Sequence, residues 1–272
     1  MKYAVLGVLI LLSLSSAVFE NMESGTRAEG MAGAFTAVGN DACTVHFNPA
    51  GLSQIDRINV YTFYELLFGG IGENLHNATL NAAVPFGRAG TLGVSVQEMG
   101  FALSSERSLT AGYGVGLLKD LSVGAGLVGY NLYMKDMGSA FALGIDLGLH
   151  ARLYRRWTVG FSAHNLNMPQ MGTNVKTYLP RVLNVGLAYT PADGIVSALD
   201  VSKEVGQPTR VAVGGEFRIV ENLLTLRAGV LTEPVRLAVG LGTGTRNIHL
   251  DYALLTHSSL PATHNLGLSV VF

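Results

Sequence analysis

From residue 57 to the end of the chain, large apolar side chains occupy every second position over many short stretches. A repeat of two residues is that of a β-strand, whereas a helix repeats every ~3.6 residues. The pattern therefore predicts strands and not helices over residues 57–272. The final segment illustrates the two faces: Leu266, Leu268, Val270 and Phe272 on one, and Asn265, Gly267, Ser269 and Val271 on the other.

About fourteen such segments follow one another, centred near residues 61, 81, 94, 112, 126, 146, 161, 185, 199, 214, 227, 239, 251 and 267. Each is roughly 9 to 12 residues long, which is the length a tilted strand needs to cross a bilayer. Short links such as "FGRAG", "LLKDL", "LYRRW" and "TPADG" alternate with longer ones, namely "LLFGGIGENL", "MGFALSSER", "YMKDMGSA" and "NLNMPQMGTNVKTYLP". Because outer-membrane barrels have short periplasmic turns and longer external loops, the alternation predicts that both chain ends are periplasmic.

The direction of the apolar face separates a membrane barrel from its rival, a soluble β-sandwich. The opposite face consists mostly of Gly, Ala, Ser and Thr with scattered charges, which is a poor surface to present to bulk water. A closed barrel of about fourteen strands is also too wide for side chains to fill, since about eight strands already reach that limit. Closure satisfies every backbone hydrogen bond in hydrocarbon. We therefore predict an all-β, transmembrane, antiparallel β-barrel whose apolar face contacts outer-membrane lipid.

Composition narrows the functional classes. Charged residues make up 14% of the chain, against roughly 25% in soluble domains, and the net charge of −1 indicates no nucleic-acid partner. Cys43 is the only cysteine, which excludes an internal disulfide and a cysteine-based zinc site. No catalytic motif is present, and His249 with Asp251 on one strand face is interpreted as a hydrogen-bonded pair. We therefore expect neither enzyme activity nor a cofactor or metal.

The start of the chain reads as a secretion signal. Lys2 supplies the positive region, residues 4–14 the apolar core, and Ser15-Ser16-Ala17 the small residues that a signal peptidase accepts. The apolar run is shorter than the ~20 residues that span a bilayer. We predict a signal peptide over residues 1–17 and a mature chain that begins near Val18 and is exported to the bacterial outer membrane.

Residues 18–56 do not alternate, and they contain glycines at 25, 30, 33 and 39. Asn48 can cap a turn, Pro49 restricts φ, and Gly51 accepts a positive φ. A wide barrel needs its lumen closed, so we predict that this segment is an N-terminal hatch, or plug, ahead of a barrel over residues 57–272.

The same segment resembles a known family. It reads Gly25-Thr26-Arg27-Ala28, then Gly30-Met31-Ala32-Gly33-Ala34-Phe35, then Asn40-Asp41-Ala42, and ends Phe47-Asn48-Pro49-Ala50-Gly51-Leu52. This sequence is similar to the N-terminal signature of the FadL/PorV superfamily, and it resembles the PorV/PorQ branch of that superfamily more closely. The resemblance implies a fourteen-stranded outer-membrane barrel with a hatch, to which Gly25, Arg27, Gly30, Gly33, Asp41, Asn48, Pro49 and Gly51 contribute.

The resemblance also implies function, and three alternatives stay open. The first is passive uptake of hydrophobic small molecules such as long-chain fatty acids. The second is a PorV/PorQ-like partner of secreted proteins or of the type IX secretion machinery. The third is a purely structural barrel. The chain is much shorter than FadL proper and has compact external loops, so we expect the ligand sites of that group to be missing or reduced.

Two sets of barrel residues are candidates for binding. The first comprises charged residues on the lumen face of the later strands, which either pair with one another and anchor the hatch or receive a ligand carboxylate: Arg210, Glu216, Arg218, Arg227, Arg236 and Asp251. The second comprises apolar residues of the longer connections, which either pack over the barrel mouth or form a rim that captures hydrophobic molecules: Leu67, Phe68, Met99, Phe101, Met134, Met137, Met168 and Met171.

Overall fold

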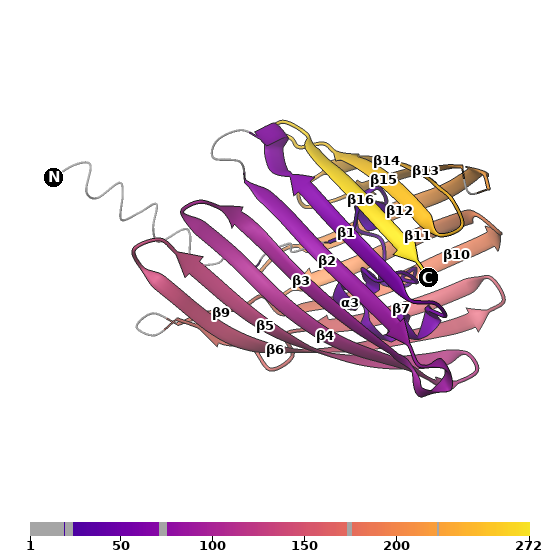
Figure 1. The fold of residues 1–272 in the computed structure, drawn as a ribbon, viewed down its shortest axis with the longest axis horizontal. Helices are drawn as coiled ribbons and strands as arrows, with labels where there is room; N and C mark the ends of the chain where they lie inside the picture. Colours follow the sequence, from indigo (N-terminus) through magenta and orange to yellow (C-terminus); the bar gives the residue numbers. More distant parts are fainter. Residues whose placement is uncertain (1–18, 20–23, 71–74, 173–175, 222) are drawn as a thin grey trace.

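The computed structural model describes Phe19 and residues 24–70, 75–172, 176–221 and 223–272. Fourteen antiparallel strands form a closed barrel, shown in Figure 1. In chain order they are β1 (Asn59–Leu66), β2 (His76–Pro85), β3 (Thr91–Phe101), β4 (Ser104–Leu118), β5 (Leu121–Met134), β6 (Gly138–Tyr154), β7 (Trp157–His164), β10 (Val182–Ala192), β11 (Ile195–Glu204), β12 (Thr209–Val220), β13 (Leu224–Leu231), β14 (Arg236–Gly244), β15 (Ile248–Leu255) and β16 (Thr263–Val271).

The predicted strand count and closure are confirmed. Every predicted strand centre falls within one of the fourteen barrel strands. β1 pairs with β16 from Asn59↔Val271 to Leu66↔His264, so the first and last strands complete the ring. Among the described residues, no helix is long and apolar enough to cross a membrane. The predicted signal peptide lies outside the described residues and stays a prediction.

Two of the four predicted longer connections are wrong. β3 continues to Phe101 and pairs there with Ser104 of β4, and β5 continues to Met134, which pairs with Gly138 of β6. The stretches "MGFALSSER" and "YMKDMGSA" therefore form strand ends joined by tight turns, because backbone pairing continues almost to the tip. The long connection between β7 and β10 instead carries a small sheet of β8 (Gln170–Met171) and β9 (Thr177–Tyr178).

The two faces of the barrel wall differ as the alternation predicts. Apolar side chains of the outer face are exposed all around the ring, for example Leu80, Leu109, Leu143, Val213 and Leu250. Their strand neighbours point inward and are smaller or polar. The outer surface is thus a continuous apolar band, which is the surface a membrane barrel presents to lipid.

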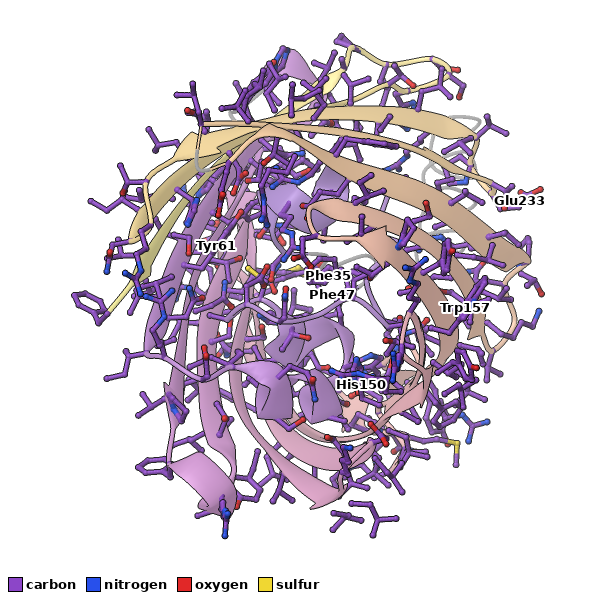
Figure 2. All side chains as sticks on the ribbon, turned by 90° about the vertical axis from the view of Figure 1, so that its right-hand side faces the viewer. Phe35, Phe47, Tyr61, His150, Trp157 and Glu233 are labelled. Atoms are coloured by element: carbon purple, nitrogen blue, oxygen red, sulfur yellow. The ribbon has the colours of Figure 1, made fainter. Side chains whose placement is uncertain are left out.

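Residues 24–56, which we call the inner segment, lie inside the barrel. They contain α2 (Thr26–Glu29), α3 (Thr44–Phe47) and the 3-10 helix η1 (Pro49–Gln54). Figure 2 shows Phe35 and Phe47 of this segment within the ring of strands, where both are buried and their rings contact edge to face at 5.2 Å. The inner segment thus supplies the core that side chains of the wall are too small to build.

Candidate functional site

The inner segment packs against a belt of glycines on the inner face of the wall. At each of these positions an added Cβ would contact atoms of the inner segment at less than ordinary van der Waals distance. The belt comprises Gly93, Gly112, Gly114, Gly124, Gly148, Gly160, Gly186, Gly214, Gly229 and Gly240.

The contacts show why glycine is required there. A Cβ on Gly124 would meet the backbone of Pro49 and Ala50, and one on Gly160 would meet the backbone of Thr36. Backbone atoms of a packed segment cannot swing away as a long side chain can. Without side chains on this belt, the inner segment rests directly on the strands.

Buried charges tie the inner segment to the wall on the β12–β15 side. Arg27 of α2 donates two hydrogen bonds to Glu216, at 2.7 Å from Nε and 2.9 Å from Nη2. Glu216 also accepts from Nε of Arg227 at 2.7 Å, and Arg227 donates from Nη1 to Asp251 at 2.6 Å. Four charged side chains from one helix and three strands therefore form one network. Charge-assisted pairs of this kind are roughly twice as strong as neutral hydrogen bonds.

Arg27 also organises the inner segment itself. Its Nη1 donates to Asn40 at 2.6 Å and to Asp41 at 3.2 Å, and its guanidinium lies 5.3 Å from the ring centre of Phe35. Burial alone would lower the pKa of Arg27, but the carboxylates of Glu216 and Asp41 outweigh it and raise that pKa. Arg27 is therefore charged and joins the start and the middle of the inner segment to the wall.

Hydrogen bonds also hold the inner segment to β6 and β11. The Asn48 amide donates to the carbonyl of Leu149 on β6 and to that of Thr36, both at 2.9 Å, and its oxygen accepts from the N–H of Ala50. The backbone N–H groups of Phe35 and Thr36 donate to Asp200 of β11 at 3.0 and 2.8 Å. The Asn48-Pro49 turn is thus a wall contact as well as a cap.

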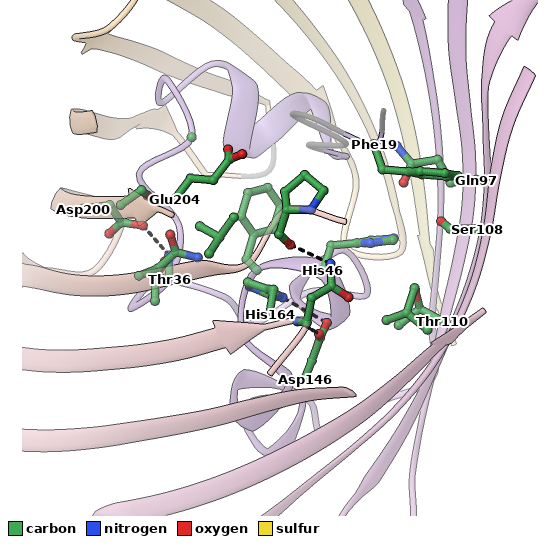
Figure 3. Close-up of a pocket in the computed structure, with 18 of the residues that line it drawn as sticks. Phe19, Thr36, His46, Gln97, Ser108, Thr110, Asp146, His164, Asp200 and Glu204 are labelled. Carbon is green, nitrogen blue, oxygen red and sulfur yellow. Dashed lines mark hydrogen bonds and ion pairs between the residues drawn. The ribbon is translucent and has the colours of Figure 1, made fainter. Parts of the chain in front are cut away.

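The inner segment divides the lumen into separate cavities. A loop-side cavity of about 180 Å³ lies toward the longer connections and is bordered by Phe19, Thr36, His46, His164 and Asp200 among others (Figure 3). Two cavities lie toward the short turns. The larger turn-side cavity of about 630 Å³ is lined by residues that include His150 and Arg152. The second has about 410 Å³ and is lined by five arginines, so we call it the arginine-lined cavity.

The loop-side cavity has an apolar end and a polar end. The apolar end is a buried cluster of Phe19, Val128, Tyr130, Met171 and Leu179, in which the rings of Phe19 and Tyr130 meet edge to face at 4.9 Å. This cluster was missed from the sequence, although strand alternation already places Val128 and Tyr130 on the inner face.

The polar end holds a Ser-His-Asp chain. Asp146 Oδ2 lies 2.9 Å from His164 Nδ1, and His164 Nε2 lies 3.2 Å from Ser162 Oγ (Figure 3 shows the first contact). This order is that of a hydrolase triad, but Ser162 is 0% exposed and does not line the cavity. Asn184 also donates to Ser162, and Asp146 accepts from the N–H of Asn165. The chain therefore holds neighbouring strands and the following loop together, and only its His164 and Asp146 members border the cavity.

His46 of α3 borders the same polar end and contacts Ser95 Oγ through Nε2 at 2.5 Å. Burial lowers the pKa of His46 from 6.5 to about 4. The imidazole is therefore neutral in the folded protein at neutral pH.

This shift predicts a pH-dependent term in stability. Because the folded pKa lies below the unfolded value, the unfolded state binds the proton first, and stability is lost as the pH falls from 6.5 toward 4. We expect the stability of the native protein to decrease more steeply across this window than that of His46→Asn. Urea unfolding of both proteins between pH 7 and 4 measures the difference. Parallel curves would contradict it.

The structure separates the predicted lumen charges. Glu216, Arg227 and Asp251 meet in one network. Arg210 borders the loop-side cavity, and Arg218 borders both turn-side cavities. Arg236 faces the lumen at the loop end of β14 and borders none of the cavities described above. Among the described residues there is no cluster of His, Cys, Asp or Glu that could hold a metal ion.

The predicted apolar rim is not one surface. Met137 lies in the β5–β6 turn and is 83% exposed, and Met168 in the β7–β10 connection is 49% exposed. Met171 is instead 4% exposed, because it packs into the apolar end of the loop-side cavity. The remaining members lie on the helix η2 (Leu67–Gly70) or at strand ends: Leu67, Phe68, Met99, Phe101 and Met134.

The residues of the predicted hatch motif all lie in the inner segment. Gly25 has a φ of 138°, and Gly33 a φ of 80°, conformations that L side chains rarely adopt. A Cβ on Gly30 would lie 3.3 Å from Gly240, and one on Gly51 would lie 2.6 Å from the Thr44 hydroxyl. Tight turns and close backbone approach thus account for four of the motif glycines.

Comparison with known proteins identifies the fold. No family model matches the chain, and no curated protein matches it. Solved structures do. The Pseudomonas putida toluene transporter TodX aligns with a TM-score of 0.69 at 14% identity, covering 93% of this chain and 99% of its own. The CymD monoaromatic hydrocarbon channel aligns at 0.68 and 13% identity, and a Pseudomonas aeruginosa FadL homologue at 0.67 and 13%, each covering 94% of this chain and 99% of its own. At these identities the likeness establishes the fold alone.

Proposed function

We propose that this protein is a bacterial outer-membrane channel for passive uptake of hydrophobic small molecules, with the inner segment as its hatch. The observation that carries the proposal is the division of the lumen. A closed barrel with an apolar outer face holds an anchored segment between a loop-side and a turn-side space. Such a segment blocks an open pore while its contacts last and admits passage when they rearrange.

Two further points support this function. The fold is shared with structures named as a toluene transporter and a monoaromatic hydrocarbon channel. The loop-side cavity also combines an apolar cluster with a few polar groups, which is the usual composition of a small-molecule site. Its volume of about 180 Å³ favours toluene-sized compounds over long-chain fatty acids in this conformation.

Uptake into proteoliposomes tests the proposal. We expect protein-dependent entry of labelled toluene and none of glucose. Val128→Trp fills the apolar end of the loop-side cavity and is expected to slow toluene entry several-fold. Leu127→Trp is the matched control, because this neighbour on the same strand is 53% exposed on the outer face. Equal rates for empty and protein-containing liposomes would refute a channel.

The second candidate function is that of a partner of secreted proteins or of the type IX secretion machinery. The PorV/PorQ-like sequence of residues 25–52 favours it. It has a different signature in experiment. Co-purification with secreted proteins, combined with no uptake of any hydrophobic probe, would support it over the channel.

A further inference from the structure

More positive than negative side chains border the arginine-lined cavity, even when the ion pairs of the network described above are counted. Five guanidinium groups border it, namely Arg27, Arg57, Arg218, Arg227 and Arg246, against the three carboxylates of Asp41, Glu216 and Asp251. Counting the arginines and carboxylates alone, this leaves an excess of two positive charges around a space of about 410 Å³. That volume lies within the ~300–1,000 Å³ range of small-molecule sites.

All three carboxylates already form ion pairs with Arg27 or Arg227. Glu216 accepts from Arg27 and Arg227, Asp251 accepts from Arg227, and Asp41 accepts from Arg27. The guanidinium groups of Arg57, Arg218 and Arg246 have no hydrogen-bond or ion-pair partner among the residues that the structure describes. Three guanidinium groups from three separate parts of the chain thus border one cavity with their donors available.

In the loop-side cavity, negative side chains outnumber positive ones. Its border includes the carboxylates of Asp146, Asp200 and Glu204 and one guanidinium, that of Arg210. An anion is therefore disfavoured in the loop-side cavity and favoured in the arginine-lined cavity.

We propose that the arginine-lined cavity binds the carboxylate of a small amphiphilic acid that approaches from the turn side. Guanidinium groups bind carboxylates through two parallel hydrogen bonds, and they do so in preference to other cations. Leu223 and Val271 border the same cavity and provide apolar contact for a short tail. The site deepens the proposed function by assigning acids a place distinct from the loop-side cavity.

This assignment moves the acid site away from Arg227, the most buried of the arginines considered from sequence. Arg227 is 9% exposed, and its guanidinium is held by Glu216 and Asp251. A ligand carboxylate at Arg227 would have to displace a carboxylate of the protein. At Arg57, Arg218 and Arg246 it displaces no carboxylate of the described residues.

Equilibrium binding tests the site without any flux. The protein is placed in phosphatidylcholine nanodiscs, and hexanoate or 1-hexanol is titrated by calorimetry. The triple variant Arg57→Gln, Arg218→Gln, Arg246→Gln is expected to bind hexanoate more weakly by at least about tenfold, the effect of losing one charge-assisted hydrogen bond. Binding of hexanol should not change.

A matched control separates the site from general surface charge. Arg88, Arg155 and Arg156 lie in short turns at the same end of the barrel but do not border the cavity. The triple variant Arg88→Gln, Arg155→Gln, Arg156→Gln should bind hexanoate as the native protein does. The proposal is overturned if both triple variants lose hexanoate binding equally, if neither does, or if hexanol binding falls in step. A folded barrel migrates faster than its heated form in SDS gels, and this confirms assembly of each variant.

The binding experiment and the uptake experiment fail independently. Hexanoate binding that depends on the three arginines stands even if toluene uptake is absent. Toluene uptake with no arginine-dependent hexanoate binding leaves the channel intact and removes only the acid site.

Discussion

Replacing Arg27 by alanine is expected to release the inner segment from the wall. The variant loses the two bonds to Glu216 and the contacts to Asn40 and Asp41. Removing one partner of a buried ion pair costs ~3–5 kcal/mol. We expect the lower end, about 3 kcal/mol, because Arg227 continues to neutralise Glu216. Opening of the segment should become on the order of a hundredfold more frequent.

The only cysteine of the chain reports this opening. Cys43 lies in the inner segment, is 2% exposed and is unreactive while the segment is seated. We expect maleimide to label Cys43 of the Arg27→Ala protein much faster than that of the native protein, since labelling follows local opening. An increase in ion current across planar bilayers should accompany it.

The control is a charge pair of similar geometry but different surroundings. Arg107 donates to Glu98 at 2.8 Å on the outer face, where the side chains are 55% and 45% exposed. Exposed pairs contribute only ~0–1 kcal/mol, so Arg107→Ala should leave the labelling of Cys43 unchanged. If Arg27→Ala labels no faster than Arg107→Ala, the network does not hold the segment.

Adding one methyl group at Gly124 is expected to have the second large effect. The new Cβ would meet the backbone of Pro49 and Ala50, including the Pro49 carbonyl oxygen at 2.6 Å. Neither the closed wall nor the capped turn at Asn48 can shift without losing hydrogen bonds. Overpacking of this kind costs ~1–3 kcal/mol. We expect a lower urea midpoint for Gly124→Ala and faster labelling of Cys43.

Gly126 provides the matched control two residues along the same strand and face. A Cβ there would meet no atom closer than 3.5 Å, which is ordinary van der Waals contact. Gly126→Ala should therefore be neutral or slightly stabilising, because alanine loses less chain entropy than glycine on folding. Equal destabilisation by both substitutions would mean that the strand, and not the seating of the inner segment, requires glycine.

Together, these variants distinguish two ways in which the inner segment is held in the barrel, namely by ion pairs and by close packing. Arg27 acts through charge on the β12–β15 side, and Gly124 acts through shape on the β4–β6 side. Arg27 lies in α2 and Gly124 in β5, and they share no partner in the contacts given above, so their effects on the free energy of opening, measured by Cys43 labelling, should be additive.

Much of the barrel was determined by local sequence. Alternation is a property of neighbouring residues, so the strand centres and the faces of residues such as Val128 and Leu127 follow from the chain alone. The same alternation placed Arg227 and Glu216 on the inner face. The interruption of the alternation over residues 18–56 predicted that this segment is not part of the wall.

Contacts between distant residues were decided only by the tertiary structure. Alternation does not reveal where pairing ends, so the tight turns after Phe101 and Met134 were expected as loops. Alternation does not reveal that Met171 joins the buried cluster around Tyr130. It also does not reveal that Arg227 forms ion pairs with two carboxylates. Nor does it show that Arg57 and Arg246 border the same cavity as Arg218. Gly124 and Pro49 lie far apart in the chain, and the need for glycine arises only when the inner segment is seated. The physical reason is that periodicity assigns a side chain to a face, whereas its partners depend on barrel closure and on what the barrel encloses.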